Sequence, residues 1–155
     1  MNSRIIVYDL EYNMNRLPCL VKCGEYAGVG KVEKPEDAYK IFEKVFCPGL
    51  KTEEYVYLMC CDSAGYIVGM FVVSQGTVVS ALQNIRGIML RALLCNASGI
   101  IVAHNHPSGE CKISKEDEGC FQKLKEICGM MEVALLDNLI LGCGNYLSFK
   151  EERLL

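Results

Sequence analysis

Two histidines stand two positions apart in this 155-residue chain, which contains no others. His104 and His106 lie at the end of the apolar run from Gly99 to Ala103, a composition typical of a buried central strand. Side chains two positions apart in extended backbone leave the same side, so both imidazoles should point in one direction. Two imidazoles at this spacing make half of a tetrahedral zinc site.

A serine and an aspartate follow at the start of a predicted helix. Ser114 and Asp117 are three positions apart, so both should face one direction from its first turn. The turn at 107–109 could fold this helix start back towards the histidines. The Asp117 carboxylate would then be a third protein ligand, with the fourth position left to water as in a catalytic zinc site.

The same residues have a simpler interpretation that stays open at this point. Ser-x-x-Asp ahead of an apolar-periodic segment is also the pattern of a helix N-cap with an acid at the third helical position, which needs no metal. A histidine at the end of an apolar strand is likewise more often a hydrogen-bonded core residue than a ligand. The two histidines flanking one turn, with a carboxylate downstream, favour the metal site.

The elements that would position these residues follow from the periodicity of the sequence. Alternation and short apolar runs predict strands at residues 3–10, 17–23, 55–61, 66–73, 99–103, 132–136, 138–142 and 146–148. Helical spacing predicts helices at 34–46, ended by Cys47-Pro48-Gly49, at 80–96, and at 114–128, ended by Gly129. This order of elements predicts an α/β sandwich with a mixed sheet.

Composition limits the class of protein. Hydrophobic residues make up 51% and charged residues 23%, as in a globular domain, and no apolar run reaches the roughly 18 residues that a membrane span needs. The net charge is −3, and the absence of a basic block argues against a nucleic-acid surface. The ten cysteines form no Cys-x-x-Cys pair and no secretory signal precedes them, so we expect a reduced, cytoplasmic protein rather than a disulfide framework.

The spacing His-x-His, seven residues, Ser, two residues, Asp resembles the motif of the JAB/MPN (JAMM) metalloproteases. The strings "HNHPSG", "LLDNLILG" and "YLSF" resemble its RadC-like branch from about Glu53 to the C-terminus. The resemblance implies an α-β-α sandwich of the JAB/MPN, cytidine-deaminase-like type over residues 34–155. Residues 1–33 would be an N-terminal extension whose short strands pack on that domain.

The resemblance also implies a set of roles. Zn²⁺ would be held by His104, His106 and Asp117 with one water, and Ser114 would donate a hydrogen bond to the oxyanion or to that water. The string "EEYVYLMCCD" resembles the family's glutamate strand and selects Glu54 over Glu53 as the group that takes the water's proton and passes it to the leaving amine. The implied activity is a zinc-dependent hydrolase acting on a peptide or isopeptide substrate.

Two other functions compete with this one. A non-catalytic MPN-type scaffold, or a DNA-associated accessory protein of the RadC type, would use the same fold. A zinc deaminase would need His-x-Glu and Pro-Cys-x-x-Cys, which the sequence does not contain. The chain also departs from the RadC-like pattern at Ile113, Asn138 and Gly87, none of them a proposed ligand. Cys111, five residues after His106, is either a bystander, which we favour, or a thiolate that closes the fourth zinc position.

Overall fold

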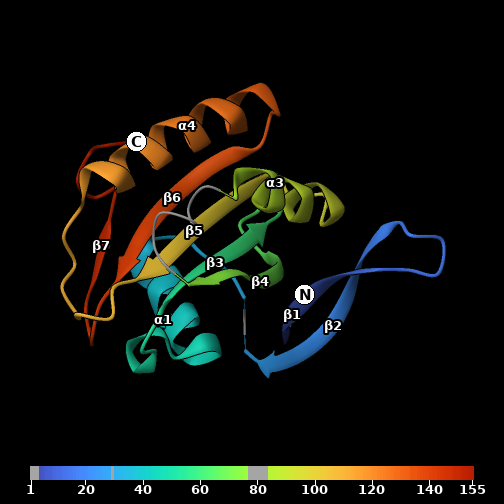
Figure 1. Ribbon diagram of the computed structural model, residues 1–155, viewed down its shortest axis with the longest axis horizontal. Coiled ribbons are helices and arrows are strands. Elements are labelled where there is room, and N and C mark those ends of the chain that lie inside the picture. Colours follow the sequence, from blue (N-terminus) through green and yellow to red (C-terminus); the bar gives the residue numbers. More distant parts are fainter. Residues whose placement is uncertain (1–3, 29, 77–83) are drawn as a thin grey trace.

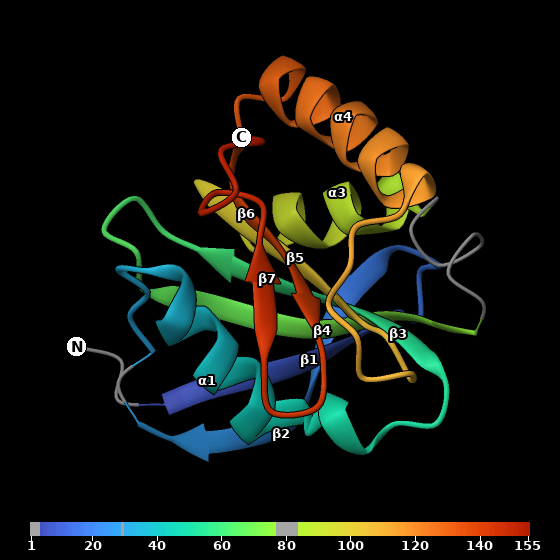
Figure 2. The same cartoon turned by 90° about the vertical axis from the view of Figure 1, so that its left-hand side faces the viewer.

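Three layers make up the molecule (Figure 1). The computed structural model describes residues 4–28, 30–76 and 84–155. A sheet forms the middle layer, with α3 (Ile85–Leu94) and α4 (Lys115–Met130) on one face and α1 (Pro35–Phe46) on the other; Figure 2 shows the same layers from the side. The α-β-α sandwich expected from the sequence is therefore confirmed.

The described residues form a seven-stranded sheet with the order β2-β1-β4-β3-β5-β6-β7. β1 runs parallel to β4 and β5 runs parallel to β6, whereas the other neighbouring pairs are antiparallel, so the sheet is mixed as predicted. The strand bounds are β1 Arg4–Tyr12, β2 Pro18–Ala27, β3 Glu54–Cys61, β4 Ile67–Gly76, β5 Gly99–Asn105, β6 Ala134–Leu141 and β7 Tyr146–Ser148. A 3-10 helix, Pro48–Leu50, follows α1.

Alternation along the central strands divides the apolar core in two. Leu58 of β3 and Val102 of β5 pack in the cluster beneath α3 and α4. Their neighbours Met59 and Ile101 pack with Phe42 of α1 on the opposite face. Every residue of β5 is buried, so the strand holds the side chains at its end, including that of His104, in fixed positions.

Local signals of the sequence explain where α1 begins and ends. Pro35 occupies its first turn, and the Asp37 carboxylate accepts a hydrogen bond from the backbone N–H of Lys34 at 3.1 Å. After the helix, Cys47 takes a left-handed conformation (φ 48°) and Pro48 prevents continuation. The predicted helix and its stop are confirmed.

The two strands predicted at 132–136 and 138–142 are wrong, because β6 is a single strand. The polar pair Asp137 and Asn138 resembles a turn in the sequence, yet it lies inside β6 and is buried. The register against β5 shifts beside Leu136, from Ile100 opposite Leu135 to Ile101 opposite Asp137, which marks a bulge rather than a break.

Other boundaries differ by a few residues. β1 extends beyond 3–10 and β2 beyond 17–23, so that Gly24 to Ala27 also belong to β2. α4 continues through Gly129 to Met130, and Glu132 is the residue that takes the left-handed conformation after it (φ 55°). Residues 80–83 of the helix predicted at 80–96 lie outside the described residues, and α3 accounts for Ile85–Leu94. The division of the chain at residues 33 and 34 stays a prediction.

Among the residues that the structure describes, no helix is long and apolar enough to cross a membrane. All ten cysteines belong to these residues and are free thiols.

Asp137 shows how β6 tolerates a buried acid. Its carboxylate accepts hydrogen bonds from the Ser148 hydroxyl at 2.6 Å and from the backbone N–H groups of Lys150 at 3.0 Å and Asn138 at 2.8 Å. Burial raises the pKa of Asp137 above its ordinary value, and these three hydrogen bonds oppose the rise. The acid therefore ties β6 to β7 and to the segment that follows it.

We predict that Asp137→Ala lowers the free energy of unfolding by about 3 kcal/mol, because three donors lose their acceptor in a buried site. Asp62→Ala is the control, since Asp62 also accepts two backbone N–H groups, those of Ala64 and Tyr66, but in a partly exposed turn. Its cost should be about 1 kcal/mol. Urea unfolding of both variants measures the difference, and equal costs would contradict this role of Asp137.

Candidate metal centre

Three predicted ligands meet at the end of β5 and the first turn of α4. One donor atom from each of His104, His106 and Asp117 lies within 4.8 Å of the others. The two Nε2 atoms are 3.1 Å apart, which confirms that both imidazoles point to one side. His104 Nε2 is 3.2 Å from Asp117 Oδ1, and His106 Nε2 is 3.9 Å from Asp117 Oδ2. Two imidazole nitrogens and a carboxylate in this arrangement could hold a metal ion.

The backbone of the connecting loop fixes the chemical form of His106. Its Nδ1 lies 2.9 Å from the carbonyl oxygen of Glu110. A carbonyl can only accept, so this contact favours the tautomer with the proton on Nδ1, which leaves the lone pair on Nε2 for a metal ion. The backbone N–H of His106 also donates to the carbonyl of Leu141 at 3.1 Å, which holds the residue beside β6. Such outer partners are typical of metal-binding histidines.

Asp117 uses its two carboxylate oxygens differently. Oδ2 accepts the backbone N–H of Ser114 at 2.8 Å, whereas Oδ1 faces His104 and accepts no hydrogen bond from the described residues. The residue is only 1% exposed, and a buried carboxylate oxygen without a donor is costly. A cation between Oδ1 and the imidazoles would remove that cost, so these residues fit a metal ion.

The protonation state of Asp117 also suits a ligand. Burial raises its pKa, but the close approach of the His104 imidazole to Oδ1 and the hydrogen bonds from Ser114 together lower the pKa to about 2. Asp117 is therefore ionised at neutral pH, as a metal ligand must be.

Ser114 is the N-cap of α4. Its hydroxyl oxygen accepts the backbone N–H of Asp117 at 3.0 Å, and together the two residues form a capping box. The simpler interpretation of Ser-x-x-Asp is therefore correct as local geometry. The helix cap does not exclude a role of Asp117 as a metal ligand, because the cap uses Asp117 Oδ2, whereas Oδ1 faces the imidazoles. The Ser114 hydroxyl also keeps its own proton for donation.

Glu54 is the first residue of β3 and is half-buried. Val56 lies opposite His104 in the ladder between β3 and β5, so Glu54, two positions earlier, leaves the same face of the sheet as the imidazole. Glu53 is exposed, and its carboxylate accepts the side-chain amide of Gln75 at 2.9 Å. These positions favour Glu54 over Glu53 beside the metal centre.

Sequence reasoning missed Asn105, which lies between the two histidines. Its Oδ1 accepts the backbone N–H of Tyr55 at 2.8 Å, and its Nδ2 donates to the carbonyl of Glu53 at 2.9 Å. One buried amide thus clamps the backbone on both sides of Glu54 and joins it to the strand that carries the histidines. Strand alternation carried a usable signal, because an asparagine between two residues that face one way must face the other and needs polar partners there.

The departures from the RadC-like pattern supply no residue to the group that could hold a metal ion. Asn138 lines a cavity of about 10 Å³ together with Asp117, so it is a near neighbour of the carboxylate ligand. At Gly87, a Cβ would come within 2.5 Å of the side chain of Asn84, the residue that caps α3. Ile113 packs against the small cluster around Phe121.

The thiol of Cys111 points away from the three ligands. Its Sγ lies 3.6 Å from the carbonyl of Ile140 and 3.5 Å from the side-chain oxygen of Asn145, in the turn between β6 and β7. Within the described residues it does not belong to the group that could hold a metal. This geometry favours the interpretation of Cys111 as a bystander.

Comparison with known proteins places this fold and site in a family. Residues 32–154 match the RadC-like JAB domain, so the chain belongs to the RadC-like JAB domain family. It is 41% identical over 100 residues to a UPF0758 protein of Haemophilus ducreyi, a match that covers 64% of this chain and 45% of that protein. UPF0758 proteins of Aquifex aeolicus and Clostridium acetobutylicum are 34% and 31% identical over 124 and 147 residues, covering 80% and 86% of this chain. Those two matches cover 52% and 64% of the relatives, so the chain spans about half the length of the curated relatives that it matches.

We predict that Asn105→Ala destabilises the protein by about 2 kcal/mol, because it leaves the N–H of Tyr55 and the carbonyl of Glu53 without their partner. Asn13→Ala is the control: the Asn13 side chain likewise makes two hydrogen bonds to the backbone, accepting the N–H groups of Asn15 and Leu17, but in an exposed turn. Hydrogen exchange at the Tyr55 amide should accelerate in the first variant alone. Unchanged protection of that amide would show that Asn105 does not hold the start of β3.

Proposed function

We propose that this protein is a zinc-dependent hydrolase of amide bonds, a metallopeptidase or isopeptidase. One observation carries the proposal: a buried aspartate and two histidines converge through three donor atoms, and the glutamate at the start of β3 leaves the same face of the sheet. Membership of the JAB domain family supports it, because the family includes hydrolases.

The donor set favours zinc among the common divalent ions. His104 and His106 supply nitrogen and Asp117 supplies one anionic oxygen, whereas magnesium and calcium prefer shells made only of oxygen. Three protein ligands also leave a coordination position open, as catalytic zinc sites do. Zinc, when bound, would act as a Lewis acid that lowers the pKa of water to about 7.

The chain's own residues would carry the protons. Glu54 would accept the proton of the attacking water and deliver it to the leaving amine, which requires a carboxylate beside the metal ligands but not on the metal. The clamp of Asn105 on the backbone around Glu54 would keep that carboxylate in register with the imidazoles. The Ser114 hydroxyl, whose oxygen is fixed by the capping box, would donate a hydrogen bond to the oxyanion.

Metal content tests the first part of this proposal. Protein purified without chelator should carry about one zinc per chain, and His104→Ala/His106→Ala should carry almost none, because a single carboxylate remains. Cys111→Ser is the control and should keep its zinc, since the thiol points away from the ligands. Elemental analysis measures the zinc content of the three proteins. Zinc retained by the double variant would show that His104 and His106 do not bind it.

Glu54→Gln separates metal binding from chemistry. Glutamine keeps the size of the side chain but cannot accept a proton at neutral pH, so this variant should fold, retain zinc and lose at least about a hundredfold in kcat. Asp117→Asn should instead lower zinc affinity, because a neutral ligand replaces an anionic one. Metal content and turnover are measured for both variants on peptides and isopeptide-linked chains.

Each outcome of that comparison has a defined meaning. Full activity of Glu54→Gln would assign the proton transfer to another group. Zinc loss as large as that of Asp117→Asn would make Glu54 a ligand. Hydrolysis absent from the zinc-loaded wild-type chain across these substrates would favour a non-catalytic scaffold.

A further inference from the structure

Two thiols meet on the face of the sheet that α3 covers. Cys60 lies near the end of β3 and is fully buried in the apolar cluster beneath α3 and α4. Cys95 follows the last residue of α3, packs against the same cluster and remains partly exposed to solvent. Neither cysteine belongs to the group of residues that could hold a metal ion, so the proposed function uses neither of them.

A glycine on β4 lets the two thiols approach each other. Gly69 lies directly opposite Cys60 in the antiparallel ladder between β3 and β4. Directly opposite residues project from the same face of a sheet, with Cβ atoms about 5 Å apart. A Cβ at Gly69 would come within 2.9 Å of Cys95 Sγ, so this sulfur takes the space that a side chain opposite Cys60 would fill. The missing side chain of Gly69 therefore places Cys95 Sγ beside the side chain of Cys60.

The two thiols differ in their tendency to ionise. A hydrogen bond with Cys95, together with burial, raises the pKa of the Cys60 thiol. The same hydrogen bond lowers the pKa of Cys95, against the opposing effect of its partial burial. Cys60 thus keeps its proton and donates it to the sulfur of Cys95. Because the thiolate is the nucleophilic form of cysteine, the partly exposed Cys95 is the more reactive of the two.

Arg91 brings a positive charge close to this pair. It precedes Cys95 by one helical turn, and its carbonyl accepts the backbone N–H of Cys95 at 3.0 Å. Its guanidinium donates to the carbonyl of Gly87 at 2.9 Å, whereas its buried Nε donates to no acceptor among the described residues. A cation beside a partly exposed thiol is typical of reactive cysteines.

We propose that Cys60 and Cys95 form an oxidation site, a thiol pair that a peroxide converts into a disulfide. The proximity of the two sulfurs, one partly exposed and one buried behind it, carries the proposal. The inference goes beyond the proposed function and does not depend on it.

The reaction with hydrogen peroxide proceeds in two steps. The Cys95 sulfur attacks one peroxide oxygen and the O–O bond breaks, which leaves a sulfenic acid on Cys95 and, with the proton of its thiol, one water. The sulfur of Cys60 then attacks Cys95 Sγ, so that the S–S bond forms and the S–O bond breaks. The proton of Cys60 leaves with the hydroxyl as a second water. The two thiols together lose two electrons, and the peroxide gains them.

Mass spectrometry of the full chain tests this site. Reduced protein, freed of reductant, is treated with an equimolar amount of hydrogen peroxide. Most molecules should lose the mass of two hydrogen atoms, and peptide mapping without reductant should find the segment of Cys60 joined to that of Cys95. Dithiothreitol should restore the original mass, because it reduces a disulfide but neither a sulfinic nor a sulfonic acid.

Matched variants assign the cross-link to its two cysteines. Cys60→Ala and Cys61→Ala change adjacent, fully buried residues of β3 that pack on opposite faces of the sheet. The first should abolish the cross-link and leave Cys95 as a sulfenic acid that dimedone labels, whereas the second should form the cross-link as the wild type does. Cys95→Ser should also abolish it, and Cys19→Ser, a change at another partly exposed thiol, should not.

Three results would overturn the site. The first is a disulfide that joins other cysteines of the wild-type chain. The second is oxidation of Cys95 to a sulfinic acid without a cross-link to Cys60. The third is equal behaviour within a matched pair, either a cross-link that persists in Cys95→Ser or one that Cys61→Ala loses as fully as Cys60→Ala does.

Discussion

The structure depends on burying the negative charge of Asp117 at the start of α4. A carboxylate at 1% exposure needs partners: Oδ2 accepts the backbone N–H of Ser114, whereas Oδ1 lies 3.2 Å from His104 Nε2 and accepts no hydrogen bond from the described residues. The positive end of the helix dipole acts in the same direction. One oxygen is used by the cap and the other points at the two rings, so helix initiation and ligand placement result from one contact.

Successive side chains of β5 point to opposite faces of the sheet, so neighbouring residues of this strand have different roles. His104 faces the metal centre, and Asn105, the next residue, reaches the start of β3 and holds the backbone around Glu54. The ladder between β3 and β5 is antiparallel, so the end of one strand and the beginning of the other lie at the same edge of the sheet. His104 and Glu54, far apart in the sequence, are thus positioned by adjacent residues of one buried strand.

The features that were predicted correctly from the sequence are those that depend on residues close together in the chain. The histidine pair, the cap at Ser114 and the end of α1 near Cys47 each follow from a few neighbouring residues, and the structure contains them. Features that depend on distant partners were missed. β6 was divided in two because Asp137 reads as a turn residue until Ser148 and Lys150, later in the chain, supply its hydrogen bonds. The clamp of Asn105 escaped prediction because its partners belong to another strand.

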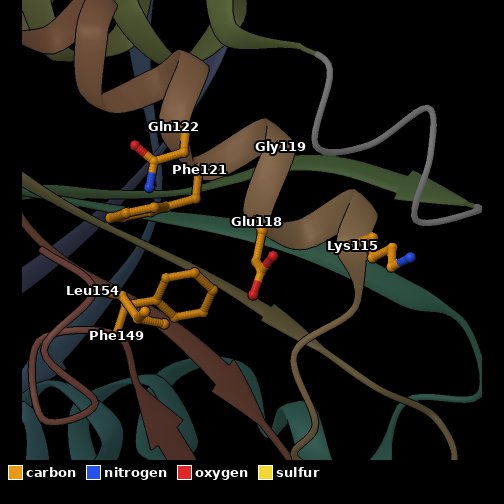
Figure 3. A pocket seen from close by; sticks show the side chains of 7 residues that line it. All are labelled: Lys115, Glu118, Gly119, Phe121, Gln122, Phe149 and Leu154. Atoms are coloured by element: carbon orange, nitrogen blue, oxygen red, sulfur yellow. The ribbon is translucent and has the colours of Figure 1, made fainter.

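The three candidate metal ligands and the pocket of about 610 Å³ between α4 and the C-terminal segment (Figure 3) have different origins in the chain. The three candidate ligands come from one short segment, His104 to Asp117, whose geometry is fixed by β5 and by the cap of α4. The pocket needs that helix but also Phe149 and Leu154 from the end of the chain. Substitutions in the terminal segment can therefore reshape the pocket while the ligands keep their positions.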